Sequence, residues 1–214
     1  MIAFFPICRG RRAAVLASLV AAVVVLGGCA LSRPAPIKHA FLLEVPAPAA
    51  GARVHPIALR VGTINVAVPF RGRAFVYRTS ALKYDADFYS EFLVAPAPMI
   101  AEITARSLDR SGVFVRVIPP GAPPDGDWVL DGFVSTLHGD VRDSANPAAE
   151  LAITFFLTRN DGASQAPFWS REYKRRVAVA EALPEGYARA LSVALGEVLA
   201  ELARDLAAAD LARK

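Results

Sequence analysis

The sequence is poor in the residues and motifs on which much catalytic chemistry depends. It contains only two cysteines and three histidines, and it has neither the HExxH nor the paired CxxC spacing that indicates a metal site. It also lacks the GxSxG nucleophile elbow and the GxxxxGK[ST] phosphate-binding loop. These absences argue against zinc enzymes, hydrolases of that serine type and ATPases. We therefore expect no metal and no cofactor.

The sequence also lacks an apolar run long enough to span a membrane. Its longest run, Ala13 to Val25, would be about 20 Å long as a helix, whereas a spanning helix needs about 20 apolar residues. Arg9, Arg11 and Arg12 come directly before it. A basic flank, a short apolar stretch and a small-residue end are typical of an export signal rather than of a membrane anchor.

One of the two cysteines stands at the end of this run. Leu26, Gly27, Gly28 and Cys29 resemble the lipobox of bacterial lipoproteins. The resemblance implies cleavage before Cys29 and acylation of that cysteine, and two or more acyl chains give stable anchoring. An ordinary secretory signal with a cysteine there by chance is the alternative. By the same resemblance, Ala30 rather than Asp after the cysteine favours the periplasmic face of the outer membrane.

Processing at this position would change the charge of the chain. The full sequence carries a net charge of +4, but the signal holds three basic and no acidic residues, which leaves 21 basic and 20 acidic side chains. A chain with no large basic excess is not expected to bind nucleic acid. Cys8 would leave with the signal and Cys29 would carry lipid, so the mature domain would have neither a free thiol nor a disulfide.

The predicted organisation has three parts. Residues 1–28 form the cleaved signal peptide, residues 29–56 hold the lipidated cysteine, a first short strand and a flexible tether, and residues 57–214 form a single α+β domain. The tether prediction rests on Ala47 to Pro56, which is rich in Ala, Pro and Gly. A domain of this size is large enough for a hydrophobic core.

The apolar patterns predict an α+β fold with one mixed, mostly antiparallel sheet of about six strands and two main helices packed on one face. The expected strands, rich in β-branched and aromatic residues, are His39–Val45, Ile57–Val66, Arg73–Thr79, Val113–Ile118, Trp128–Leu137, Leu151–Thr158 and Phe168–Val179. The last two are expected to form a hairpin around Asn160-Asp161-Gly162. A first helix is expected over Pro96 to Arg110, ended by Gly112.

The second helix, from Pro184 to about Ala209, shows the clearest pattern. One apolar stripe recurs at helical spacing along Tyr187, Leu191, Leu195, Val198, Leu202 and Leu206. We expect this stripe to pack on the sheet. A coiled-coil seam and a membrane-surface helix are alternatives, and the second is disfavoured because the polar face is acidic as often as basic.

Two charged segments are considered as sites. Asp85, Asp87 and Glu91 form a carboxylate cluster, but a glycosidase needs two carboxylates that flank its substrate, and these three lie in one short segment. We interpret the segment as solvated, with aromatic side chains that pack or contact a partner. A basic run on a later strand is interpreted as a solvated edge, with lipid head groups or an acidic partner as the alternative; it comprises Arg171, Lys174, Arg175 and Arg176.

The middle of the chain resembles the ABC-type transport auxiliary lipoproteins. The matching features are Gly72-Arg73, the apolar-Tyr-Arg strand ending at Arg78, the aromatic segment Tyr84 to Phe92, and Pro96-Ala97-Pro98 before a helix. The early strand after His39, the Asp127 to Gly132 strand and the C-terminal helix follow in the family's order. Phe92 departs from the pattern, because many members carry Trp there.

This resemblance implies a non-catalytic accessory role in lipid transport across the cell envelope, beside an ATPase, a permease and a protein with an MCE domain. The candidate contacts with that MCE-domain partner are Arg73, Arg78, Tyr84, Phe88 and Tyr89, because exposed Tyr and Arg are enriched where interfaces carry energy. Core packing is the alternative for Phe88, as for Tyr77 and Phe92. A stabilising lipoprotein of another outer-membrane complex and an envelope hydrolase are alternative functions, and phospholipid binding and a homo-oligomer are left open.

Overall fold

The computed structural model describes residues 37–46, 54–123, 126–162 and 166–211. The chain from Lys38 onward forms one compact unit. The expected signal peptide, the lipobox and Cys29 lie outside the described residues, and so does most of the predicted tether. None of the helices in the described part is both long and apolar enough to cross a membrane.

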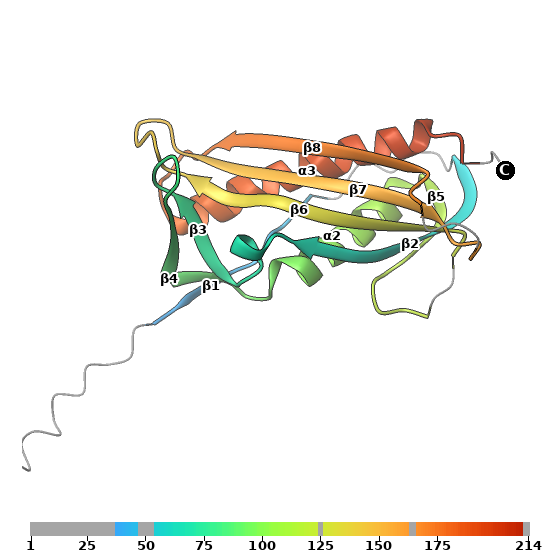
Figure 1. Ribbon diagram of the computed structural model, residues 1–214, viewed down its shortest axis with the longest axis horizontal. Coiled ribbons are helices and arrows are strands. Elements are labelled where there is room, and N and C mark those ends of the chain that lie inside the picture. The colour runs from blue at the N-terminus through green and yellow to red at the C-terminus, as the bar shows by residue number, and fades with distance from the viewer. Residues whose placement is uncertain (1–36, 47–53, 124–125, 163–165, 212–214) are drawn as a thin grey trace, which may run out of the picture. The chain divides into compact units, whose positions relative to one another are not determined.

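Eight strands, two α-helices and a short 3-10 helix make up this unit (Figure 1). The strands are β1 (His39–Phe41), β2 (His55–Val66), β3 (Ala74–Arg78), β4 (Tyr84–Phe92), β5 (Phe114–Ile118), β6 (Trp128–Asp140), β7 (Ala148–Arg159) and β8 (Trp169–Ala178). The helices are η2 (Val68–Phe70), α2 (Pro96–Ser111) and α3 (Pro184–Ala208).

Strand β6 organises the sheet. On one side it pairs antiparallel with β7 along its whole length, and β7 pairs antiparallel with β8. On its other side β6 is parallel first to β2 and, at its last two residues, to β3. Two arms thus start from the same edge: the first arm, β2 and β5, and the second arm, β3, β4 and β1. The predicted α+β class with one mixed sheet is confirmed, and the longest ladders are antiparallel, although the strands number eight rather than about six.

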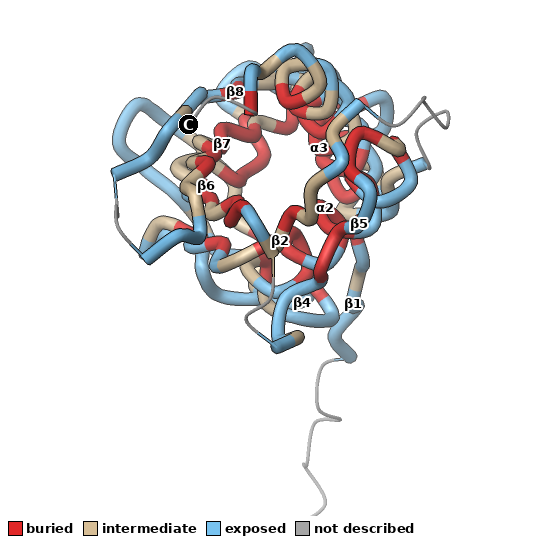
Figure 2. The backbone as a smooth tube through the Cα atoms, turned by 90° about the vertical axis from the view of Figure 1, so that its right-hand side faces the viewer, coloured by how far each residue is buried: buried red, intermediate tan, exposed pale blue. Residues whose placement is uncertain are grey.

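Both helices cover the same face of this curved sheet (Figure 2). Helix α2 packs on β2 and β5, α3 packs on β7 and β8, and the two helices contact each other. All six residues of the predicted α3 stripe are buried, which confirms a helix packed on a sheet. Gly112 ends α2 as expected, with a φ of 72°, a left-handed conformation that costs glycine little.

The structure corrects the element boundaries in three places. The first strand is shorter than predicted, because only His39–Phe41 pairs with β4. Residues His55 and Pro56 begin β2 instead of ending a loop. Most importantly, the aromatic segment Tyr84–Phe92 is strand β4, which pairs with β3 on one side and with β1 on the other. It carries few buried residues, so the apolar alternation that marks a strand in the sequence is weak here.

Candidate interaction surface

A bulge in β4 turns two aromatic side chains outward. Val76 pairs with Ala86 and Ala74 with Glu91, so β4 has more residues than β3 can oppose between these points. The Asp87 side chain holds the extra residues, because its Oδ1 accepts hydrogen bonds from the backbone N–H groups that follow, at 2.8 and 3.0 Å. The carboxylate thus replaces ladder hydrogen bonds that the bulge removes.

Phe88 and Tyr89 are the residues that this bulge exposes. Their side chains are 60% and 55% exposed, and their rings meet edge to face with centroids 5.2 Å apart. The Lys38 Nζ atom lies 5.3 Å from the centroid of the Phe88 ring, within the range of a cation–π contact. We call these three residues the bulge patch. Core packing, the alternative for Phe88, does not occur.

An ion pair network fixes the backbone beside the bulge patch. Glu91 is bound by the Lys38 ammonium group at 3.3 Å and by the Arg73 guanidinium group. Desolvation raises the pKa of Glu91, but these two cations outweigh it and hold the pKa below its usual value. Arg73 also donates to the Leu93 carbonyl oxygen. Arg73 therefore acts within the fold, joining the start of β3 to the end of β4.

The β3–β4 hairpin carries a second exposed group, the hairpin patch, made of Arg78, Leu82 and Tyr84. Leu82 at the hairpin tip is 95% exposed and Tyr84 is 42% exposed. The guanidinium carbon of Arg78 lies 5.7 Å from the centroid of the Tyr84 ring, and the same group donates to the carbonyl oxygens of Ser80 and Ala81. Arg78 therefore fixes both the tip of the hairpin and the tyrosine beside it.

Tyr84 rests on a buried support that comes from β6 and η2. Its ring lies 5.4 Å from the ring of His138 and 6.1 Å from that of Phe70, between centroids. His138 is 3% exposed, and burial lowers the pKa of its imidazole. At neutral pH the tyrosine therefore packs against an uncharged ring. The aromatic support leaves part of Tyr84 exposed for contact.

Asp140, also 3% exposed, anchors the end of β6 next to this support. It accepts hydrogen bonds from Arg142 and from Arg176 of β8, each with a nitrogen–oxygen distance of 2.7 Å. The hydrogen bond from Arg142, followed by that from Arg176, outweighs burial and holds the pKa of Asp140 well below its usual range. Arg176 also binds Glu150 on β7. The network joins three strands on the face that lies away from the helices.

The three carboxylates considered for catalysis face separate partners. Asp85 binds Thr79 Oγ1 and the Lys83 ammonium group, at 3.1 and 3.0 Å. Asp87 caps the bulge, and Glu91 binds the two cations described above. Within the part of the chain that the structure describes, no group of three or more His, Cys, Asp and Glu side chains is arranged to hold a metal ion.

The basic run on β8 is divided between the two faces of the sheet. Arg171 and Arg175 point to the helix side, where they bind Glu201 of α3. Arg176 points to the opposite face and joins the Asp140 network, and Lys174 binds Glu172 at 2.8 Å. Because each of these cations has a carboxylate partner, the run is mainly a clamp between strands and helix, and it offers little free charge to lipid or to an acidic partner.

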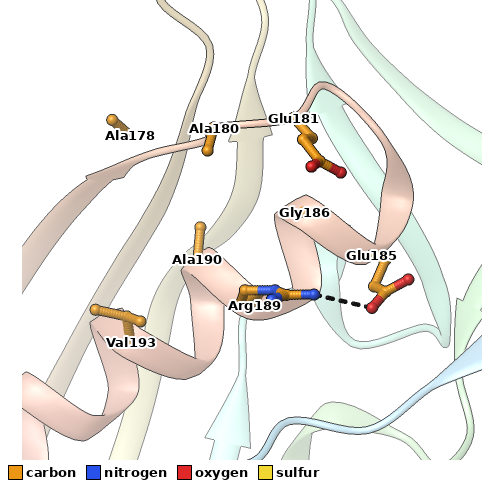
Figure 3. Close-up of a pocket in the computed structure, with 8 residues that line it drawn as sticks. All are labelled: Ala178, Ala180, Glu181, Glu185, Gly186, Arg189, Ala190 and Val193. Atoms are coloured by element: carbon orange, nitrogen blue, oxygen red, sulfur yellow. Dashed lines mark hydrogen bonds and ion pairs between the residues drawn. The ribbon is translucent and has the colours of Figure 1, made fainter.

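A hollow of about 220 Å³ lies between the end of β8 and the first turns of α3 (Figure 3). Its wall consists mostly of small side chains, and it includes an exposed ion pair between Arg189 and Glu185 at 2.9 Å. Gly186 is required here, because a Cβ atom at that position would lie 2.1 Å from the Glu181 carbonyl oxygen. The hollow results from this close crossing of backbone segments.

Comparisons with known proteins support the fold. No family model matches the sequence, and no curated protein matches it significantly. The structure is similar to that of a Xanthomonas campestris protein described under the family name DUF330, with a TM-score of 0.69 and 17% identity over 78% of this chain and 93% of that one. A second structure, of an uncharacterized protein, has a TM-score of 0.63 and 16% identity over 79% and 99% of the two chains.

A weaker likeness is to the PelC dodecamer from Paraburkholderia phytofirmans, with a TM-score of 0.36 and 14% identity over 72% of this chain and 92% of that one. This similarity is too low to support an argument about assembly. Self-association of the present chain therefore stays a prediction. At identities below one fifth, the two stronger matches establish the fold and nothing further.

All five predicted contact residues lie on the second arm, but they belong to two places. Arg78 and Tyr84 belong to the hairpin patch, Phe88 and Tyr89 to the bulge patch, and Arg73 to the ion pairs behind the bulge. Sequence reasoning missed Lys38 and Leu82. An apolar residue in the polar turn before Lys83 was the available signal for Leu82, whereas no local pattern joins Lys38 to Phe88.

Proposed function

We propose that this protein is a lipid-anchored accessory component of an ABC-type lipid transport system, held at the periplasmic face of the outer membrane. In this role it binds an MCE-domain partner and performs no catalysis. The proposal is supported by the lipobox-like sequence at Cys29, by the family resemblance from Phe70 to Ile100, and by a fold shared with a protein described as DUF330. We expect any contact with phospholipid to accompany this role.

The observation that carries the proposal is the hairpin patch. It combines a fully projecting leucine with a tyrosine held between buried rings and an arginine. Tyr and Arg are frequent in the energetic centres of protein interfaces, and a tyrosine fixed before binding loses little conformational entropy on contact. We therefore assign the contact with the protein partner to the hairpin patch.

Photocrosslinking in intact cells tests this assignment. A photoreactive phenylalanine analogue replaces Leu82 in one strain and Val115, an exposed residue of β5 at the opposite end of the sheet (Figure 1), in a control strain. We expect the Leu82 position to capture an MCE-domain protein and the Val115 position to capture none. Capture of other outer-membrane proteins alone would favour the assembly role.

A substitution gives the matching energetic test. Tyr84→Ala removes the central ring of the patch, and we expect recovery of the partner to fall about tenfold, which corresponds to about 1.4 kcal/mol. Circular dichroism should show an intact fold, because the ring is partly exposed. Unchanged recovery from a folded variant would contradict the assignment.

The anchor is tested separately at Cys29. Cys29→Ala should leave the longer, unprocessed form, because cleavage of lipoprotein signals follows acylation of the cysteine. Mass spectrometry of the wild-type protein should show the mass of the mature chain plus its acyl groups. A mature mass without lipid would refute the anchor and leave an ordinary secretory signal.

A further inference from the structure

The bulge patch lies beside the point at which the chain enters the fold. Lys38 comes immediately before β1, and β1 is parallel to β4 with His39 opposite Ser90. Through this pairing Lys38 contacts both Glu91 and the ring of Phe88. Whatever is attached to the chain ahead of Lys38 is therefore attached next to Phe88 and Tyr89.

The length of the intervening chain limits how far a lipid anchor can lie from this patch. Lys38 is the ninth residue after Cys29, and nine residues span at most about 30 Å when fully extended. Strand β5, by contrast, lies at the opposite end of the sheet (Figure 1). Among the exposed aromatic residues, Phe88 and Tyr89 are thus among those that a Cys29 anchor keeps near the bilayer surface.

The chemistry of the patch suits the interface of a bilayer. Aromatic residues with a polar end concentrate at the level of the head groups, and lysine places its ammonium group there while its stem covers apolar surface. Further exposed apolar side chains lie on the backbone around the patch: Ile37 precedes Lys38, and Leu42 and Leu93 follow β1 and β4. The Leu93 N–H group donates to the Phe41 carbonyl oxygen at 2.8 Å, which keeps these two backbone segments together.

We infer that the bulge patch is a second membrane contact, in which Phe88 and Tyr89 enter the phospholipid head-group layer and Lys38 faces the phosphates. This inference rests on the acylation of Cys29 in the proposed function. An acyl tether alone leaves the domain free to rotate, and a second contact fixes its orientation. The second arm then lies along the membrane with the hairpin patch at its end.

Depth-dependent fluorescence quenching tests this contact. Phe88→Trp and, as the control, Val115→Trp are prepared in the full lipidated protein and reconstituted into vesicles of phosphatidylethanolamine and phosphatidylglycerol with brominated acyl chains. We expect the indole introduced by Phe88→Trp to be quenched at least about threefold more than the one introduced by Val115→Trp. Its quenching should be strongest by bromines close to the head groups, where indole rings settle. The unsubstituted protein gives the background of Trp128 and Trp169.

A second variant asks whether the bulge is needed. Asp87→Ala in the Phe88→Trp background removes the hydrogen bonds that hold the bulge, and we expect the excess quenching at position 88 to fall by at least half. Equal quenching in the Phe88→Trp and Val115→Trp proteins, both acylated, would overturn the inference and leave the anchor intact.

The failures of the two proposals are distinguishable. A mature chain without acyl groups would overturn the anchor and this inference with it. Selective quenching in the Phe88→Trp protein without any MCE-domain partner in the cell would support the membrane contact and refute the proposed partner. Loss of partner recovery in the Phe88→Ala, Tyr89→Ala double variant, without selective quenching, would assign the patch to a protein and overturn the inference.

Discussion

The two arms of the sheet start from the same edge of β6 but are attached to it very differently. The first arm pairs with β6 from Leu59 to Val66 and is covered by α2. The second arm pairs with β6 at only two residues, Tyr77 and Arg78. The first arm is thus part of the hydrophobic core, whereas the second presents most of its aromatic surface to the outside. Attachment by few ladder bonds leaves this arm free to carry exposed contacts.

Side-chain packing replaces the missing ladder in the second arm. Phe75 lies between Phe41 and Phe92, with centroid distances of 5.3 and 4.6 Å. Tyr77 meets Tyr187 of α3 edge to face at 4.9 Å. Such aromatic pairs contribute about 0.5–1.5 kcal/mol each beyond their burial. The second arm is therefore held by rings more than by hydrogen bonds to β6.

The largest expected effect comes from the first arm. Leu59→Ala removes a side chain that is completely buried among the core residues, and we expect it to lower the free energy of unfolding by about 2–5 kcal/mol. Urea denaturation followed by circular dichroism measures this loss. A loss below about 1 kcal/mol, well under the range for such substitutions, would show that β2 is not part of the cooperative core and would remove the contrast between the arms.

A smaller effect is expected where the second arm meets α3. A Cβ atom at Gly139 would lie 2.7 Å from the rings of both Tyr77 and Tyr187, so Gly139→Ala should cost about 1–3 kcal/mol through overpacking. Gly72→Ala is the matched control, because nothing lies within 4 Å of its added methyl group. Hydrogen exchange should show faster exchange in β3 and β4 for Gly139→Ala alone.

The Asp140 network predicts a pH dependence. Because the arginines lower the pKa of Asp140 in the folded protein, the unfolded state binds the proton more tightly. This contribution to stability is complete above the unfolded pKa of about 3.9 and is lost as the pH falls below it. Asp140→Asn should cost about 1–2 kcal/mol at neutral pH and much less at a pH of about 3, below the unfolded pKa, measured by urea denaturation. An equal cost at both pH values would contradict the assignment.

The smallest effect on stability is expected from the bulge patch. Phe88→Ala should change the free energy of unfolding by less than about 0.5 kcal/mol, because the ring is mostly exposed. The same change should abolish selective contact with the bilayer. A loss above about 1 kcal/mol, beyond the usual range for surface substitutions, would show that Phe88 serves the fold, and the second arm would then resemble the first.

The core elements could be predicted from the sequence because their signals are local. The α3 stripe, the end of α2 at Gly112 and the β7–β8 hairpin each depend on residues close together in the chain. Strand β4 and the last residues of β6 could not be predicted in this way. Asp85 and Asp87 are satisfied by local turns, but Asp140 is satisfied by Arg176, thirty-six residues away.

The same reasoning explains the outcome at the candidate surface. Local composition pointed to the aromatic and basic residues between Arg73 and Tyr89, all of which the structure places on one arm. Their division into two patches depends on contacts across the sheet: Lys38 reaches Phe88 through the β1–β4 pair, and His138 reaches Tyr84 from β6. Such distant pairings leave no periodic trace in one sequence.

The parallel pairing of β1 with β4 also has a mechanical consequence. Tension applied to the chain ahead of Lys38, along the direction of the strand, loads the β1–β4 hydrogen bonds together in shear instead of opening them one at a time. Behind β1, the Glu44 N–H group donates to Ser192 Oγ at 3.0 Å, which gives the chain a second fastening on α3. A pull on the tether therefore reaches the edge of the sheet and one helix first, and the domain can bear load at the end where it is attached.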